Sequence, residues 1–150
     1  MRGGTWNTVS YNIIGWIGLN VFLCLLSIPL IPVLERIFGF ISPITLGELS
    51  DMNRPLLEKL ARQAAGTWQH SLNVANMAEQ AARAIGADAL LVKTAALYHD
   101  IGKVTNPGFF IENQGGPNPH EKLGPKESAE IIIGHVPKGI KLARQAKLPE

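Results

Sequence analysis

Cysteine, clustered basic charge and strand-like patterns are all scarce in this chain. Among 150 residues Cys24 is the single cysteine, and it lies in an apolar stretch, so a disulfide framework and a thiolate zinc site are excluded. The formal net charge is only +2, and no stripe of basic and aromatic residues occurs, which argues against nucleic acid as a partner. No strand alternation or internal repeat is present. The sequence therefore predicts an all-α fold.

Charge is also absent from one long apolar stretch, Ile13 to Leu34. A helix of this length spans roughly 33 Å at about 1.5 Å per residue, enough to cross a bilayer core of about 30 Å. The stretch is too long for a signal peptide, and no small-residue cleavage site follows it. We predict an N-terminal transmembrane segment over residues 1–34, in which Pro29 and Pro32 bend or end the helix.

The residues that flank this stretch predict its orientation. Aromatic residues gather at its start, as at a membrane interface: Trp6, Tyr11 and Trp16. Arg2 is the one basic residue before it, whereas several follow it: Arg36, Arg54, Lys59 and Arg62. Since positive charge accumulates on the cytoplasmic side, the C-terminal part is expected in the cytoplasm, with membrane lipid as a partner. A single-pass or multi-pass protein and a homo-oligomer both stay open.

Helix start and stop signals divide the rest of the chain. Residues 35–54 are expected to form a juxtamembrane connector with short helical pieces, and residues 55–150 a helical domain. The first two helices of this domain are predicted from Pro55 to a stop at Gly66, with Asn53 or Arg54 as cap, and from about Thr67 to Ile85, with a stop at Gly86.

The second half of the domain contains a long loop between helices. Asp88 is expected to cap a helix that runs through Asp100 and is closed by Gly102. Residues 105–124 are rich in Gly, Pro and Asn and predict an irregular loop, a kind that is usually functional or disordered when so long. Helices over about 125–137 and 139–147 follow.

Three histidines fall on apolar helical faces or at the ends of apolar helices. His70 lies on an apolar stripe, His99 directly precedes Asp100, and His135 closes the stretch AEIIIGHV. Each alone has an ordinary explanation, as a core histidine or as a solvated histidine beside a capping carboxylate. Together they have the arrangement of a metal cluster in a helical bundle, and imidazole with carboxylate suits manganese, iron, zinc or nickel. The residues alone leave both explanations open.

Several motifs carry a resemblance to a known family. GTWQHS, YHDIGK, FFIENQGGPNPHEKLGP and SAEIIIGHV, with PLIPVLERIFGF and TLGELSD before them, resemble the HD-domain phosphohydrolases. Among these they most closely resemble the membrane-bound seven-transmembrane HD family, the PgpH-type cyclic di-AMP phosphodiesterases. HDIGK is common to the superfamily, whereas the long loop motif is more specific. The resemblance covers roughly residues 28–150.

The resemblance implies a partial HD-domain bundle over residues 55–150, cytoplasmic and attached to a bacterial cell membrane. It implies two divalent metal ions, manganese or iron: His70, His99 and Asp100 match ligands of the first, Asp100 also matches the bridging carboxylate, and His135 matches a ligand of the second. In such enzymes two cations activate the water that attacks the phosphorus of a cyclic dinucleotide, here best matched to cyclic di-AMP, and opens it to linear pApA.

Three further residues receive roles. Lys103 is expected to act beside Asp100 in catalysis and to contact a substrate phosphate as a point charge; the alternative is a favourable charge near a helix C-terminus. His120 and Lys122 match the loop motif and are expected to bind substrate or to order the loop, with a plain loop role as the alternative.

The family pattern continues with a histidine pair and a later aspartate that this sequence lacks. Because missing ligands weaken metal binding severely, we expect a fragment of a larger enzyme that is itself inactive or nearly so. Two other functions stay open. One is a non-catalytic, membrane-tethered HD module for nucleotide sensing or scaffolding; the other is an HD phosphohydrolase with a different nucleotide specificity.

Overall fold

The computed structural model describes the backbone of residues 4–149 and the side chains of residues 10–149. Arg2 and the side chain of Trp6, on which part of the orientation prediction depends, lie outside the described residues. The chain divides into two compact units, Met1–Ser42 and Pro43–Glu150. The predicted domain boundaries at residues 34 and 54 stay predictions.

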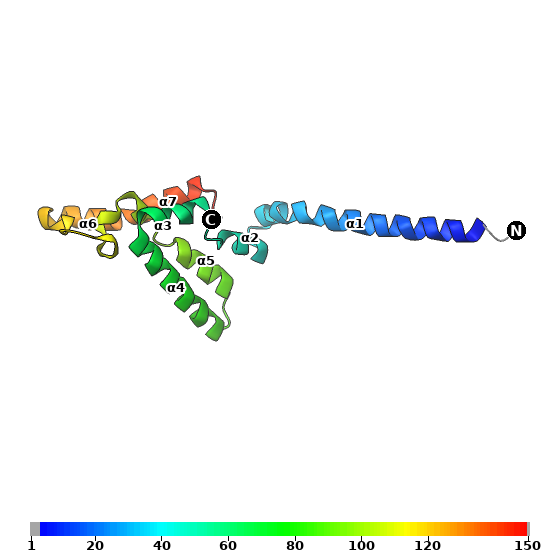
Figure 1. Ribbon diagram of the computed structural model, residues 1–150, viewed down its shortest axis with the longest axis horizontal. Helices are drawn as coiled ribbons and strands as arrows, with labels where there is room; N and C mark the ends of the chain where they lie inside the picture. The colour runs from blue at the N-terminus through cyan, green and yellow to red at the C-terminus, as the bar shows by residue number, and fades with distance from the viewer. Residues whose placement is uncertain (1–3, 150) are drawn as a thin grey trace. The chain divides into compact units, whose positions relative to one another are not determined.

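The first unit consists mainly of α1, Gly4–Phe38, drawn as one long helix in Figure 1. Its segment Ser10–Phe38 is long and apolar enough to cross a membrane, and the most apolar part of it has no buried residue. Of the two predicted effects of Pro29 and Pro32, bending or ending the helix, the second is wrong. Both prolines lie inside α1, which ends where Gly39 takes a φ of 68°.

Within residues 43–149, the second unit is built from six α-helices and a loop of 3₁₀ turns. The α-helices are α2 Pro43–Leu49, α3 Pro55–Gln63, α4 Ala65–Ala84, α5 Ala89–Tyr98, α6 Pro125–Ile133 and α7 His135–Gln145. The 3₁₀ turns are η1 Ile101–Thr105, η2 Pro107–Phe109, η3 Ile111–Asn113 and η4 Pro119–Lys122. No strand occurs among residues 4–149, and the predicted all-α class is confirmed.

Several start and stop signals act as predicted. Pro55 begins α3 with Arg54 at the N-cap position. The Asp88 carboxylate accepts the N–H of Leu91 at 2.9 Å and so caps α5. Gly86 follows α4 with a φ of 72°, a conformation that costs glycine little.

Gly66 and Gly102 do not stop helices, contrary to prediction. Gly66 lies in the first turn of α4, and Gly102 lies in η1, since α5 already ends at Tyr98. A Cβ at Gly66 would lie 1.7 Å from the carbonyl oxygen of Glu112, and one at Gly102 would lie 1.8 Å from that of His135. Both positions need glycine because another backbone segment packs directly against them.

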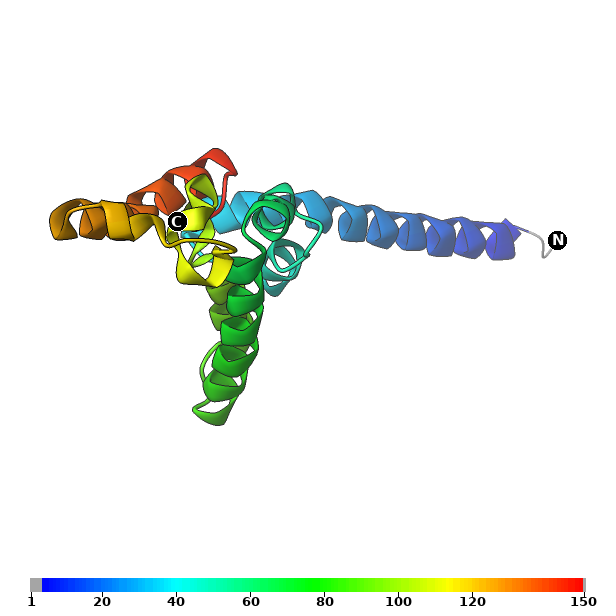
Figure 2. The same cartoon turned by 60° about the vertical axis from the view of Figure 1, so that its left-hand side comes forward.

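The helix predicted over residues 125–137 is interrupted. α6 ends at Ile133, and after Gly134 the chain begins α7 with His135, which is therefore the first residue of a helix and not the last. Pro137 explains the break: it cannot continue the interior of α6, but it fits the first turn of α7, where no N–H is required. α6 extends away from the other helices of its unit in Figures 1 and 2.

The core of this unit lies between α3, α4, α5 and η1. α4 and α5 lie side by side in both views (Figures 1 and 2). One buried cluster contains Leu60, Ala64, Ile101 and Val104, and a second contains Leu57, Ala75 and Leu97; Trp68 packs against both. α2 is attached to α5 by the Tyr98 hydroxyl, which donates to the carbonyl of Leu49 at 2.8 Å. The core thus holds α4, α5 and η1 together at the point where they carry polar residues.

A candidate metal centre around Asp100

Three imidazoles gather around the carboxylate of Asp100, whose side chain is only 8% exposed. Oδ2 of Asp100 lies 3.3 Å from Nε2 of His99 and 3.9 Å from Nε2 of His70. Oδ1 lies 3.3 Å from Nε2 of His135. The structure therefore brings together the four residues that the sequence analysis singled out; that they bind metal stays a prediction.

Each of these side chains comes from a different place in the fold. His70 lies on α4, His99 is the C-cap of α5, and His135 opens α7. Asp100 follows at the point where the α-helix gives way to η1, with φ −108° and ψ 15°. This change of backbone conformation allows neighbours at 99 and 100 to face one point, which two residues within a regular helix do not do.

Backbone contacts orient two of the rings. Nδ1 of His99 lies 2.8 Å from the carbonyl oxygen of Ala96, and Nδ1 of His135 makes a similar contact with the carbonyl of Ile132. Because a carbonyl oxygen only accepts, each Nδ1 is the donor, and each Nε2 faces the carboxylate. A lone pair on Nε2 that faces a carboxylate oxygen needs a positive charge between them, either a proton or a metal ion.

The donor set fits a divalent metal ion. Ligand atoms of His70, His99 and Asp100 all lie within 4.8 Å of one another. Two imidazole nitrogens with a carboxylate oxygen form a set that transition metals favour, and a histidine held by a carbonyl at its other nitrogen is typical of metal ligands. His135 faces the second oxygen of the same carboxylate.

Lys103 also contacts Asp100. Its Nζ lies 2.8 Å from Oδ2 of Asp100 and 2.8 Å from Oε1 of Glu112. Burial acts to raise the pKa of Asp100, but the contacts with His99 and Lys103 outweigh it and hold that pKa well below its usual range. The contact with Asp100 raises the pKa of His99, against the effect of burial. Asp100 is therefore a charged acceptor shared by several cationic or polar groups.

Glu112 is the second carboxylate that contacts Lys103, and it also accepts a hydrogen bond from Thr67. Burial would raise the pKa of Glu112, but Lys103 and Thr67 lower it below its ordinary value. The Thr67 hydroxyl donates to Oε1 of Glu112 at 2.9 Å, and Asn113 exchanges hydrogen bonds with Thr67. Phe110 packs edge-on against the ring of His135, with centroids 5.6 Å apart.

No role was predicted from the sequence for these supporting residues. Phe110, Glu112 and Asn113 lie within the loop motif FFIENQ. No charge pattern or residue spacing in the sequence predicts that Glu112 contacts Lys103 or Thr67. Their one sequence signal was membership of that motif.

The two other predicted loop residues, His120 and Lys122, lie on η4. Nε2 of His120 lies 2.9 Å from the carbonyl oxygen of Phe109, and its Nδ1 contacts the hydroxyl of Ser128. Both ring nitrogens are thus engaged by protein groups, which favours the loop-ordering role for His120. Lys122 is exposed at the end of η4.

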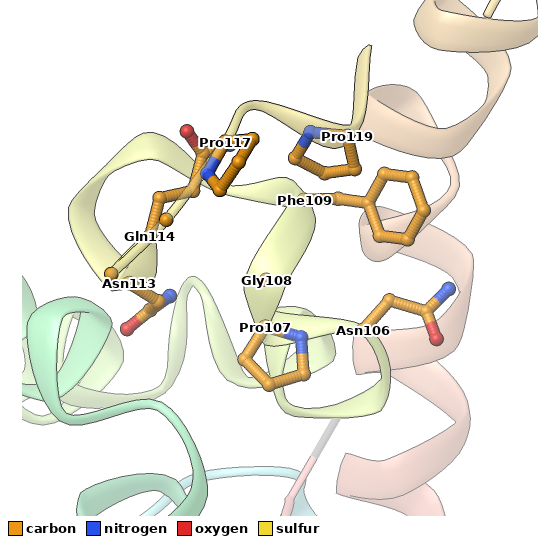
Figure 3. Close-up of a pocket in the computed structure, with 10 residues that line it drawn as sticks. Asn106, Pro107, Gly108, Phe109, Asn113, Gln114, Pro117 and Pro119 are labelled. Carbon is orange, nitrogen blue, oxygen red and sulfur yellow. The ribbon is translucent and has the colours of Figure 1, made fainter. Parts of the chain in front are cut away.

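The loop also borders an open cavity of about 370 Å³, shown in Figure 3. Three proline rings and one phenylalanine ring form part of its wall, and three side-chain amides and three glycines form the rest. Its lining residues are Asn106, Pro107, Gly108, Phe109, Asn113, Gln114, Gly115, Gly116, Pro117 and Pro119. None of the four residues gathered at the candidate metal centre lines this cavity.

Comparison with known proteins identifies the class. The HD domain family matches residues 67–150, a segment that contains the three histidines and Asp100. This chain belongs to the HD domain family.

Particular relatives are found within that family. The cyclic-di-AMP phosphodiesterase PgpH of Listeria monocytogenes is 42% identical over 134 residues, which cover 89% of this chain and 18% of that protein. The cyclic-di-AMP phosphodiesterase PgpH of Bacillus subtilis is 46% identical over 126 residues, 83% of this chain and 18% of that protein. This chain therefore spans less than a fifth of these relatives.

A solved structure shares the fold. The HD domain of the L. monocytogenes phosphodiesterase PgpH, in complex with cyclic-di-AMP, matches with a TM-score of 0.63 and 44% identity. The match covers 67% of this chain and 47% of that chain.

Proposed function

We propose that this chain carries part of the catalytic site of a metal-dependent phosphodiesterase that hydrolyses cyclic di-AMP. The observation that supports this most directly is the gathering of His70, His99 and His135 around Asp100 in a chain similar to two PgpH phosphodiesterases. In the reaction, water adds to one phosphorus and the bond from phosphorus to O3′ breaks. The departing O3′ takes a proton, and the product is linear pApA.

The residues would hold two divalent ions, for which we propose manganese or iron. Nε2 of His70 and of His99 with Oδ2 of Asp100 would serve the first ion, and Oδ1 of Asp100 with Nε2 of His135 the second. Such ions, when bound, supply positive charge that lowers the pKa of water and stabilises the charge that develops on phosphate oxygens. The carbonyls of Ala96 and Ile132 keep two of these rings in the tautomer that such ligands need.

Lys103 is proposed to contact the substrate. An ammonium has three N–H donors, and the contacts with Asp100 and Glu112 use two of them. The third can donate to a phosphate oxygen of the dinucleotide. His120 and Lys122 are proposed to act through the loop, His120 by fixing it to α6 and Lys122 by attracting the anionic substrate.

The site of action is proposed to be the cytoplasmic face of a bacterial cell membrane, with α1 as a membrane span. Fusion of green fluorescent protein or of alkaline phosphatase after Glu150 tests this orientation. We expect fluorescence and no phosphatase activity in bacteria; the reverse result would contradict the proposed orientation.

Hydrolysis of cyclic di-AMP tests the activity. The assay measures pApA by chromatography with Mn²⁺ present, in this chain and in the longest product that its gene encodes. Asp100→Asn should lower the rate at least 100-fold in whichever form is active, since a neutral amide is a poor metal ligand. Glu79→Gln is the matched control, because Glu79 pairs with Lys93 and Arg83 on the surface.

One result would refute the proposed activity, and another would refute only the proposed substrate. Nucleotide binding without turnover in the longest product would favour a sensing or scaffolding module. Faster turnover of cyclic di-GMP or of a nucleoside triphosphate would refute the proposed substrate while leaving an HD phosphohydrolase.

A further inference from the structure

Lys103 is held from two sides at the edge of the candidate metal centre. Its Nζ lies between Oδ2 of Asp100 and Oε1 of Glu112, at 2.8 Å from each, and it lies 5.0 Å from the centre of the Phe110 ring. The side chain of Lys103 is 14% exposed. Lysine has a long, flexible stem, so a single partner would leave its ammonium free to turn away. Two carboxylates that accept from the same ammonium restrict it more than one would.

Glu112 is itself held by the beginning of α4. Thr67, which is fully buried, donates its hydroxyl to Oε1 of Glu112 at 2.9 Å. Asn113 accepts the Thr67 N–H at 3.0 Å and donates to the Thr67 hydroxyl at 2.8 Å. The close packing of the Glu112 backbone on Gly66 fixes the same segment a second time.

This network joins the elements that carry the metal-site residues. Thr67 lies one turn before His70 on α4, and Lys103 lies on η1, which follows Asp100. The contact from Glu112 to Lys103 therefore adds a polar link between η1 and α4 to the apolar packing of the core. The ammonium that Glu112 contacts is the one that lies 2.8 Å from Oδ2 of Asp100.

We propose that Glu112 is a positioning residue, which acts through Lys103 to fix the orientation of the Asp100 carboxylate and thereby the affinity of the site for a divalent ion. Hydrogen-bonded partners of a ligating carboxylate commonly contribute about 10- to 100-fold to metal affinity. The inference rests on the proposed function only in taking Asp100 as a metal ligand. It does not require that the chain hydrolyse cyclic di-AMP.

Metal affinity in four proteins tests the inference. The full chain in detergent is titrated with Mn²⁺, and free Mn²⁺ is measured by electron paramagnetic resonance, for wild type, Glu112→Gln, Lys103→Met and the double variant. We expect Glu112→Gln to weaken Mn²⁺ binding about tenfold. In the Lys103→Met background the same change should have an effect below twofold, because Glu112 acts through that lysine.

Glu79→Gln is the control for removal of a paired glutamate charge. Glu79 lies about two and a half turns beyond His70 on α4 and pairs with Lys93, so its loss should leave Mn²⁺ affinity within twofold. Circular dichroism at the titration temperature verifies that each variant is folded.

The outcomes separate this inference from the proposed function. If Glu112→Gln lowered Mn²⁺ affinity by the same factor in wild type and in the Lys103→Met background, the inference would be overturned. Glu112 would then have only a role in folding. Unchanged affinity in Glu112→Gln would overturn it as well. Tenfold weaker Mn²⁺ binding in a protein that never hydrolyses cyclic di-AMP would support it while the proposed function fails. Absence of Mn²⁺ binding both in the wild-type chain and in the longest product that its gene encodes would overturn both.

Discussion

Replacing Gly102 by alanine should separate α7 from η1 and damage the candidate metal centre. The added methyl group would lie 1.8 Å from the carbonyl oxygen of His135 and 2.6 Å from the amide nitrogen of Gly139. Both are backbone atoms, so no side-chain rotation relieves the contact. The segment that carries His135 must move instead.

The size of the effect follows from the distances. Ordinary contact begins at 3.4 Å, so α7 must move by about 1.6 Å to accept the methyl group. Overpacking of a close contact costs typically about 1–3 kcal/mol, and we expect about 3 kcal/mol here because backbone atoms are involved. At about 4–8 °C per kcal/mol for a unit of about 100 residues, Tm should fall by about 12–24 °C.

The same movement should reach the site. A shift of about 1.6 Å disrupts the approach of His135 to Asp100, now at 3.3 Å. Mn²⁺ affinity should therefore fall at least tenfold, even at temperatures where the variant is folded.

Thermal unfolding by circular dichroism and Mn²⁺ titration of the full chain in detergent measure both effects. Gly108→Ala is the matched control, since a Cβ there meets nothing within 4 Å. It should change stability by no more than about 0.5 kcal/mol. A Gly102→Ala protein with the Tm and Mn²⁺ affinity of the control would refute the packing of α7 on η1.

Four further changes have expected outcomes. Asp88→Ala removes the cap of α5 and should destabilise the chain by about 1 kcal/mol in urea unfolding; no change would mean that the cap adds nothing. Ser71→Ala should be neutral or stabilising by up to about 1 kcal/mol in the same assay, because the buried Ser71 hydroxyl has no hydrogen-bond partner among the described residues. Tyr98→Phe should cost about 1 kcal/mol by leaving the Leu49 carbonyl without its donor, and hydrogen exchange in α2 should rise; unchanged exchange would contradict this. Chelation of divalent ions should lower Tm in wild type but not in Asp100→Asn, and an equal fall in both would place the stabilising ion elsewhere.

The helices were largely predictable because their signals are local. Asp88 as a cap and Gly86 as a stop each depend on a few neighbouring residues, and both act as predicted. Gly66 and Gly102 were misinterpreted because a glycine that admits another backbone cannot be distinguished in sequence from one that ends a helix. The distinction depends on residues 46 and 33 positions away, Glu112 and His135, and no local pattern contains it.

The candidate site also contains residues that the sequence predicts and residues that it does not. The histidines and Asp100 were identifiable because imidazoles on apolar helices are unusual, and the motifs around them resemble a known family. Glu112 was not identifiable, since a glutamate in a polar loop is ordinary until the fold brings it to Lys103. The break at Gly134 is not predictable for a related reason: Pro137 is as well suited to the first turn of a helix as to the end of the preceding one.

The two prolines inside α1 have a consequence for what surrounds that helix. Pro29 and Pro32 lack N–H groups, so the carbonyls of Leu25 and Ile28 lose their usual helical partners. In hydrocarbon an unpartnered carbonyl costs several kcal/mol. If α1 lies in a bilayer, the side that bears these two oxygens should therefore turn toward a neighbouring helix or a water-accessible crevice, and the opposite side toward lipid tails.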